Sequence, residues 1–294
     1  QSTVVLMNAW NSLKIRFNQL TISEKLIAIM VVLFVLPFFI RTILFLFNIS
    51  STNFLQWFEL YPSFETLILR PWTLITYGFF HASLGHIFWN LLLMYFVGRM
   101  LLNLFNERQF INIFFNGILL GGIVFVASYS LFPVFSGQFP PLVGSSAGVM
   151  ALLVFLAAYA PYQQIYVWFF KIKIVYVALF LVLLDVIQIP TNNAGGHLAH
   201  LGGAFWGWFY QYQLAKGNDV GRWFSNSCES VIKWFSSSKT PFKTVYKTTK
   251  TKKSTPRSAI HQQKIDAILD KISASGYESL TQEEKDFLFR SGNQ

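Results

Sequence analysis

Six apolar stretches, each about as long as a helix that crosses a lipid bilayer, dominate this sequence. A run of about twenty apolar residues spans the roughly 30 Å hydrocarbon core when it is helical. No water is available there, so backbone N–H and C=O groups must pair within the segment, which a helix achieves. The predicted spans are Leu26–Leu46, Ile87–Phe105, Phe110–Phe132, Leu142–Tyr159, Ile174–Ile189 and Leu198–Tyr212.

The composition agrees with a chain whose solvent is mostly lipid. Hydrophobic residues make up 53% of the sequence and charged residues 12%, which is too apolar for a water-soluble domain. The single cysteine, Cys228, excludes an internal disulfide framework. The predicted fold class is therefore an all-α polytopic membrane protein, a bundle of six transmembrane helices. The aromatic-rich connection Asn48–Phe80 is expected to lie at the membrane interface and to be partly helical.

Lysine and arginine predict the orientation in the membrane, because they accumulate on the cytoplasmic side. The loops Pro133–Pro141 and Pro190–Gly196 carry neither residue and are expected outside. Both termini are therefore predicted to be cytoplasmic. The basic residues on the opposite side are Lys14, Arg16, Lys25, Arg99, Arg108, Lys171 and Lys173.

The chain is predicted to have four parts: a cytoplasmic segment (1–25), the six-span core (26–214), a basic linker (215–257) and a small amphipathic helical appendage (258–294). The linker residues Lys233 to Arg257 include many bases and no acid, which favours contact with anionic lipid headgroups. A nucleic-acid site is the alternative, but no binding fold accompanies it, so we expect no nucleic-acid partner.

The appendage has the features of a helical hairpin. Its apolar residues recur at helical spacing, and Thr281 with Glu284 forms a capping box for a second short helix. We expect a regulatory or docking role. The apolar residues of the first helix are Ile265, Ile268, Leu269 and Ile272.

Polar residues inside the spans are costly in lipid and usually functional. The second, fourth and sixth spans run in the same direction, and His86, Ser146 and His200 each lie near the start of one. At 1.5 Å per residue these three share one layer, roughly 5 to 10 Å below the outer surface. The polar residues in or beside the spans are His81, His86, Asn90, Ser145, Ser146, Asp185, His197 and His200.

Ser146 has two interpretations. Small residues from Gly144 to Gly148 indicate close helix packing, and Gly203 and its small neighbours give the sixth span a matching face. The same contact would bring Ser146 within reach of His200, which is the requirement for a base-activated nucleophile. The position of the histidine favours the nucleophile.

The other polar residues have simpler interpretations. His81 and His197 are expected to be structural, at loop edges, and Asp185 to be a capping or packing acid. No H-E-x-x-H motif occurs, and Asp185 is the one acid within the predicted spans, so zinc-protease and two-aspartate chemistry are both disfavoured. We expect no metal and no cofactor.

Three sequence blocks resemble, in order and spacing, the signature of rhomboid intramembrane serine proteases. They are His81-Ala-Ser-Leu-Gly-His86-Ile-Phe-Trp-Asn90, Gly144-Ser145-Ser146-Ala147 and Ala199-His200-Leu201-Gly202-Gly203. The resemblance covers the predicted core from about Leu26 to Leu214.

The resemblance implies roles for several residues. Ser146 corresponds to the nucleophile and His200 to its base, acting as a dyad without a carboxylate, in agreement with the lack of an acid near His200 in the sequence. His86, Asn90 and the Ser146 N–H correspond to the oxyanion donors. Four positions depart from the family pattern: Thr73, Leu102, Ala147 and Met150, the last replacing an aromatic ring that stacks on the histidine.

The resemblance implies a serine endopeptidase that cleaves transmembrane protein substrates near the outer face of a bacterial inner (cytoplasmic) membrane. The alternatives are a catalytically silent relative that binds membrane clients, and a small-solute channel using the same polar layer. Substrate identity and oligomeric state are not predicted.

Overall fold

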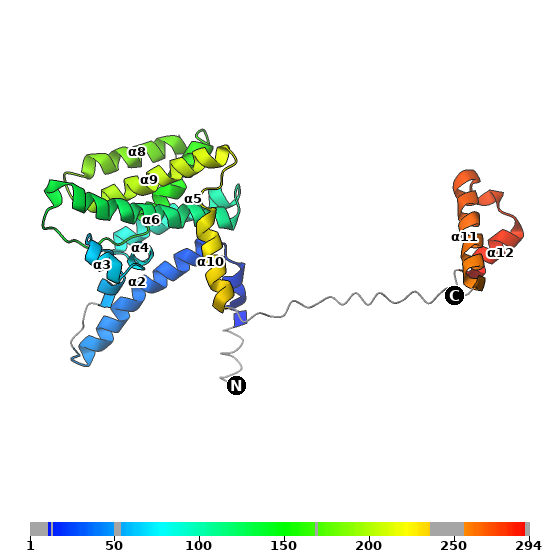
Figure 1. Ribbon diagram of the computed structural model, residues 1–294, viewed down its shortest axis with the longest axis horizontal. Coiled ribbons are helices and arrows are strands. Elements are labelled where there is room, and N and C mark those ends of the chain that lie inside the picture. The colour runs from blue at the N-terminus through cyan, green and yellow to red at the C-terminus, as the bar shows by residue number, and fades with distance from the viewer. Residues whose placement is uncertain (1–10, 13, 50–53, 168–169, 236–255, 292–294) are drawn as a thin grey trace. The chain divides into compact units, whose positions relative to one another are not determined.

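A computed structural model describes residues 11–291, apart from 13, 50–53, 168–169 and 236–255. The chain divides into two compact units, Gln1–Ser236 and Ser237–Gln294. In the first unit, long helices pack against one another around α6 and α9 (Figure 1). Its longer helices are α2 (Ile22–Leu46), α5 (Leu84–Leu102), α6 (Glu107–Leu131), α7 (Ser146–Tyr159), α8 (Ile174–Gln188), α9 (Ala194–Ala215) and α10 (Arg222–Phe235).

Three of these helices, α2, α5 and α6, are long and apolar enough to cross a membrane. The helix α7 is apolar but has 14 residues, which corresponds to about 21 Å and is shorter than the bilayer core. The helix α8, with 15 residues, is similarly short. The structure therefore supports a helical membrane protein without establishing six complete spans.

Helix boundaries follow local capping signals. Thr21 and Glu24 form a capping box at the start of α2, and Asn106 with Gln109 forms another at the start of α6. Because of these caps, α2 starts four residues before its predicted apolar run, and α6 starts three residues before its own.

The predicted span Leu142–Tyr159 is wrong at its beginning. Leu142 pairs with Leu60 in an isolated antiparallel β-bridge, and α7 begins only at Ser146. The reason is Gly144, whose φ of +124° no helix can contain and whose N–H donates to the Tyr77 carbonyl oxygen at 2.9 Å. Non-helical backbone therefore continues up to Ser145, directly before α7.

Residues between α2 and α5 are partly helical, as predicted. The connection contains η1 (Phe54–Trp57), α3 (Phe64–Leu69), α4 (Thr73–Thr76) and η2 (Tyr77–Phe79). Its aromatic rings Trp57, Phe64 and Trp72 are exposed.

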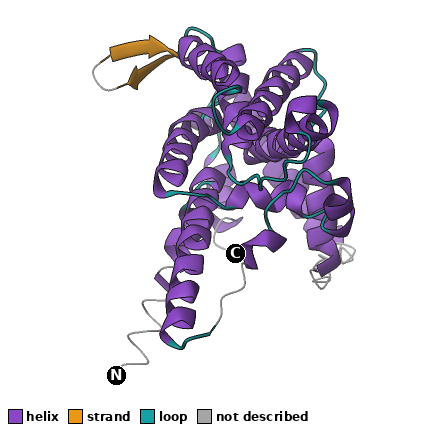
Figure 2. Cartoon of the chain, turned by 90° about the vertical axis from the view of Figure 1, so that its left-hand side faces the viewer, coloured by secondary structure: helices purple, strands orange, loops and turns teal. Residues whose placement is uncertain are grey.

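A β-hairpin interrupts the otherwise helical fold, which the all-α prediction did not include. Strands β1 (Gln164–Val167) and β2 (Phe170–Lys173) pair antiparallel between α7 and α8. The hairpin extends away from the helices (Figure 2). Two of the predicted cytoplasmic bases, Lys171 and Lys173, lie on β2.

The core of the first unit is the contact of α6, α7 and α9, and glycines make it close. A side chain at Gly203 or Gly207 of α9 would meet the backbone of Ala147 or Ala151 in α7. A Cβ at Gly117 of α6 would lie 2.5 Å from the Ala151 Cβ. The predicted packing of small residues between the fourth and sixth apolar stretches is confirmed.

The region after residue 214 contributes helices to both units. The range 215–257 was expected to be a linker, but α10 occupies part of it and docks on α6, where the Ser225 N–H donates to Asn112 Oδ1 at 3.1 Å. The basic residues from 236 to 255 lie outside the described residues. The second unit contains α11 (Pro256–Ser275), η4 (Tyr277–Ser279) and α12 (Gln282–Ser291), with the predicted capping box at Thr281 and Glu284.

Candidate active site

Ser146 is the first residue of α7 and directly follows the non-helical segment 142–145. The first four N–H groups of a helix have no partner inside the helix, and they carry the positive end of its dipole. The Ser146 hydroxyl and its own N–H therefore sit together at an electropositive helix end. The residue is partly exposed, whereas the adjacent Ser145 is fully buried.

The contact of α7 with α9 brings Ser146 and His200 onto facing helices. A Cβ placed at Gly121 of α6 would lie 2.5 Å from the Ala147 Cβ and 2.8 Å from the Ala199 carbonyl oxygen. Ala147 follows Ser146 and Ala199 precedes His200, so both candidate residues flank one point of helix contact. No hydrogen bond joins the Ser146 hydroxyl to the His200 ring, both of which the structure describes.

His86 lies beside the same serine. A Cβ at Gly144 would lie 2.6 Å from His86 Nε2 and 3.6 Å from Ser146 Oγ. The tip of the His86 ring and the Ser146 hydroxyl therefore both lie within 4 Å of the Cβ position of Gly144. His86 is also within electrostatic range of His200. His86 of α5 thus lies near both Ser146 of α7 and His200 of α9.

Asn90 lies one helical turn after His86 on the same face of α5 and is buried. Its Nδ2 donates to the His86 carbonyl oxygen at 2.9 Å. An amide nitrogen carries two N–H groups, so one remains for another acceptor.

His81 supports the segment before Ser146. Its Nε2 lies 3.3 Å from the Ser145 hydroxyl, and its ring meets the His86 ring edge-on at a centroid distance of 5.1 Å. Burial, and secondarily the nearby His86 charge, lowers the pKa of His81 to about 3, so this ring is neutral at ordinary pH. These contacts agree with the structural role predicted for it.

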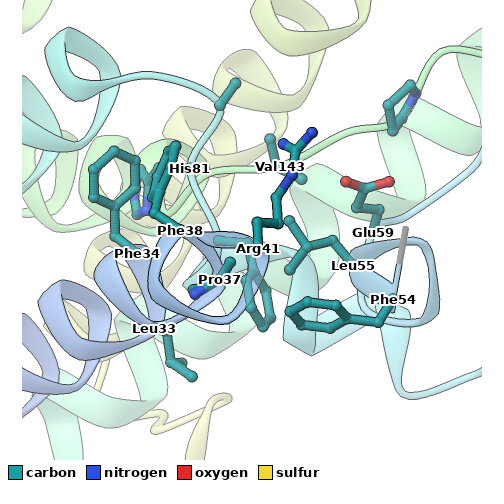
Figure 3. A pocket seen from close by; sticks show the side chains of 13 residues that line it. Leu33, Phe34, Pro37, Phe38, Arg41, Phe54, Leu55, Glu59, His81 and Val143 are labelled. Carbon is teal, nitrogen blue, oxygen red and sulfur yellow. The ribbon is translucent and has the colours of Figure 1, made fainter. Parts of the chain in front are cut away.

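A cavity of about 540 Å³ opens beside this segment. It lies between α2 and the connection, and its wall includes His81 and Val143 (Figure 3). Figure 3 also shows Arg41 of α2 and Glu59 of the connection among the lining side chains. The cavity therefore reaches the edge of the candidate site from the side of α2.

No acid is close to His200 in the sequence, but a carboxylate lies beside its ring in the structure. Asp185 Oδ1 lies 2.8 Å from His200 Nδ1 and 2.7 Å from His197 Nδ1. Its carboxylate faces α9 and does not cap α8. The connection from α8 to α9 is short, so the last turn of α8 adjoins the first turns of α9. A signal in the sequence could have predicted this contact. Asp185 lies near the end of an apolar helix, where a carboxylate needs hydrogen-bond partners, and His197 and His200 follow on the next helix.

The remaining predicted residues lie around this centre. His197 is buried in the first turn of α9, with its Nε2 3.5 Å from Asn192 Oδ1. Met150 is buried in α7, and Gly203 touches the Ala147 backbone. In the described residues, the atoms that could hold a metal ion together belong to Asp185, His197 and His200, within 4.8 Å of one another.

A comparison with known protein families decides the affiliation of this chain. The model of the Rhomboid domain matches residues 69–217, about half of the sequence, and includes all of the site residues described above. The chain belongs to the rhomboid family. The second unit matches, over residues 253–290, a family of unknown function (DUF6576).

One curated relative of this rhomboid protein is RHOMBOID-like protein 12, mitochondrial, from Arabidopsis thaliana. The two sequences are 28% identical over an alignment of 147 residues, which covers 46% of this chain and 44% of the relative. The chain therefore spans less than half the length of that relative.

Proposed function

We propose that this rhomboid protein is an intramembrane serine endopeptidase. In this proposal Ser146 attacks the peptide carbonyl carbon of a transmembrane substrate, and His200 accepts the hydroxyl proton. The acyl-enzyme forms as the amine product leaves with a proton from His200, and water then hydrolyses it.

The observation that carries the proposal is the close packing at Gly121 of α6. A Cβ added there would lie 2.5 Å from the Ala147 Cβ and 2.8 Å from the Ala199 carbonyl oxygen, so their neighbours Ser146 and His200 lie on helices that both pack against this glycine. Catalytic hydrogen bonds are often loose before substrate binds, so the missing Ser146–His200 bond is compatible with this role.

In this proposal, three donors stabilise the developing oxyanion. The Ser146 N–H lies at the start of α7, the His86 ring tip and the Ser146 hydroxyl both lie within 4 Å of the Cβ position at Gly144, and Asn90 has one amide hydrogen left. Each such donor is worth about 3 kcal/mol in comparable sites.

We also propose six membrane crossings, in which the short helix α7 is completed by the non-helical residues Leu142 and Gly144, both buried, that precede it. Both termini would then be cytoplasmic and the site would open to the outer face of a bacterial inner membrane. The late start of α7 supports this arrangement, because it sets Ser146 below the loop and within reach of water.

The experiment compares Ser146→Ala with Ser145→Ala in purified protein. Cleavage of a single-span substrate and labelling by a fluorophosphonate probe should vanish in Ser146→Ala only. Ser145 is the matched control, because it is the adjacent serine and its hydroxyl contacts His81. Labelling that persists in Ser146→Ala contradicts the assignment of the nucleophile.

A catalytically silent protein that binds membrane clients is the second candidate. The lack of a hydrogen bond between Ser146 and His200 in the described structure is the observation that favours it. A wild-type protein that resists the probe but retains a transmembrane client in detergent supports this candidate.

A further inference from the structure

Asp185 places a carboxylate next to the proposed general base. One oxygen, Oδ1, lies 2.8 Å from His200 Nδ1 and 2.7 Å from His197 Nδ1. The exposed fractions of the Asp185, His197 and His200 side chains are 9%, 10% and 21%. The three side chains come from the last turn of α8 and the first two turns of α9.

These distances favour hydrogen bonds over a metal centre. Zinc bonds of about 2.0 to 2.1 Å in a tetrahedral site hold neighbouring ligand atoms about 3.3 Å apart. The observed 2.7 and 2.8 Å are shorter and match N–H···O⁻ bonds. Both imidazoles therefore donate an Nδ1–H to the same carboxylate oxygen.

Burial explains why Asp185 needs both partners. An isolated carboxylate in an apolar environment is strongly destabilising, and α8 is otherwise almost entirely apolar. His197 and His200 lie three residues apart on α9 and so share one face. That face is turned toward α8, and the two rings together provide the hydrogen-bond partners of Oδ1 of the carboxylate.

The bond to Asp185 has a chemical consequence for His200. A neutral imidazole that carries its proton on Nδ1 has a lone pair on Nε2, and only that nitrogen can accept a proton from a serine. A carboxylate on Nδ1 also stabilises the imidazolium that forms during attack.

We infer that Asp185 is a positioning residue that fixes the tautomer and orientation of His200. This inference rests on the proposed function, and it turns the expected dyad into an Asp185–His200–Ser146 triad. Asp185 does not contact the substrate; it acts through the imidazole, from a third helix. His197 holds the other side of the carboxylate in place.

The test measures kcat, KM and the rate of fluorophosphonate labelling for wild type and Asp185→Asn across pH. The substitution keeps the size and removes the charge. We expect kcat and labelling to fall at least about tenfold with KM unchanged, since the equivalent change in a soluble triad costs about 10⁴-fold.

The acid limb of the pH–rate profile should move to lower pH in Asp185→Asn, because the protonated ring loses its counter-charge. The other titratable groups facing His200 are His86 from α5 and His197 on α9, and both remain. The residues of α6 and α7 that contact this part of α9 are Gly121, Val124 and Ala147, and none of them titrates.

The matched control is Asp219→Asn. Asp219 also accepts a hydrogen bond from a side chain of α9, the Tyr210 hydroxyl at 2.6 Å, but near the opposite end of that helix. Its kcat and pH profile should equal those of wild type. A purely structural role for Asp185 predicts an unchanged pH profile and an unchanged kcat in the folded fraction, which overturns the inference.

A second readout does not depend on catalysis. Nitrogen-15 spectra of histidine-labelled protein should show His200 protonated on Nδ1 and not on Nε2, with that preference lost in Asp185→Ala.

If wild type neither cleaves nor reacts with the probe, the proposed function fails, while the His200 tautomer still decides the role of Asp185. Inactivation by EDTA with recovery in zinc, or a His200 protonated on Nε2, contradicts the inference.

Discussion

The backbone carbonyl of Ala147 lies directly against the Cα of Gly203, so that α7 and α9 touch without an intervening side chain. This contact is one residue from the proposed nucleophile and three from the proposed base. Close approach of this kind replaces the hydrophobic effect as the packing force between helices in lipid.

Gly203→Ala should separate these helices. The added Cβ meets backbone atoms, which cannot rotate away, so we expect destabilisation of about 1–3 kcal/mol and loss of probe labelling. Thermal unfolding in detergent and labelling of the folded fraction measure the two effects.

Gly85→Ala is the control for that substitution. It lies in the first turn of α5 with nothing within 4 Å of its Cβ position, so stability should be equal or higher. Equal stability of Gly203→Ala and Gly85→Ala contradicts the packing argument.

Gly144→Ala should disable the site for two reasons. Its φ of +124° disfavours any side chain, and the new Cβ would lie 2.6 Å from His86 Cε1 and Nε2. We expect the His86 ring to be displaced and kcat to fall by about 10²-fold or more, as on loss of an oxyanion donor.

Gly137→Ala separates backbone strain from the collision. Gly137 also has a positive φ, +76°, but its Cβ position is open. Its kcat should stay close to that of wild type; a loss equal to that of Gly144→Ala would assign the effect to backbone strain alone.

Asn90→Ala should lower kcat with little change in KM. The amide has one hydrogen on the His86 carbonyl and one left for the oxyanion, which is present only along the reaction path. Removal of one such donor costs about 10²–10³ in kcat. Steady-state cleavage of a transmembrane peptide measures it, and a rise in KM at constant kcat argues for a ground-state role.

The helix α12 of the second unit should become less stable in acid. A hydrogen bond from Lys271 Nζ, followed by the Thr281 backbone N–H, lowers the pKa of Glu284 from its usual 4.5 to about 2. Because the folded pKa is depressed, the stabilisation is complete above pH 4.5 and disappears as pH falls toward about 2.

Hydrogen exchange of α12 amides across this pH range measures the effect. Glu284→Gln should remove the pH dependence between pH 4.5 and about 2, whereas Glu283→Gln should retain it, since Glu283 is its neighbour in the first turn of α12. Identical curves for the two variants contradict the assignment to Glu284.

The sequence alone predicted the helical membrane class, the family and the three signature blocks, because apolar length and residue spacing are local properties of the chain. It also identified Gly203 as a packing residue, since small residues at helical spacing have few other uses in lipid. The capping box at Thr281 was readable for the same reason: its partners lie three residues apart.

Only the tertiary structure decided the start of α7 and the partner of His200. Helix periodicity does not report the bridge between Leu142 and Leu60, eighty-two positions away, and so the prediction carried the helix too far. Asp185 and His200 are fifteen residues apart, and a hydrogen bond between them exists only because a short turn folds α8 back along α9. Spacing along one helix is set by covalent geometry, whereas a contact between helices depends on how their faces pack, and that information is distributed over the whole bundle.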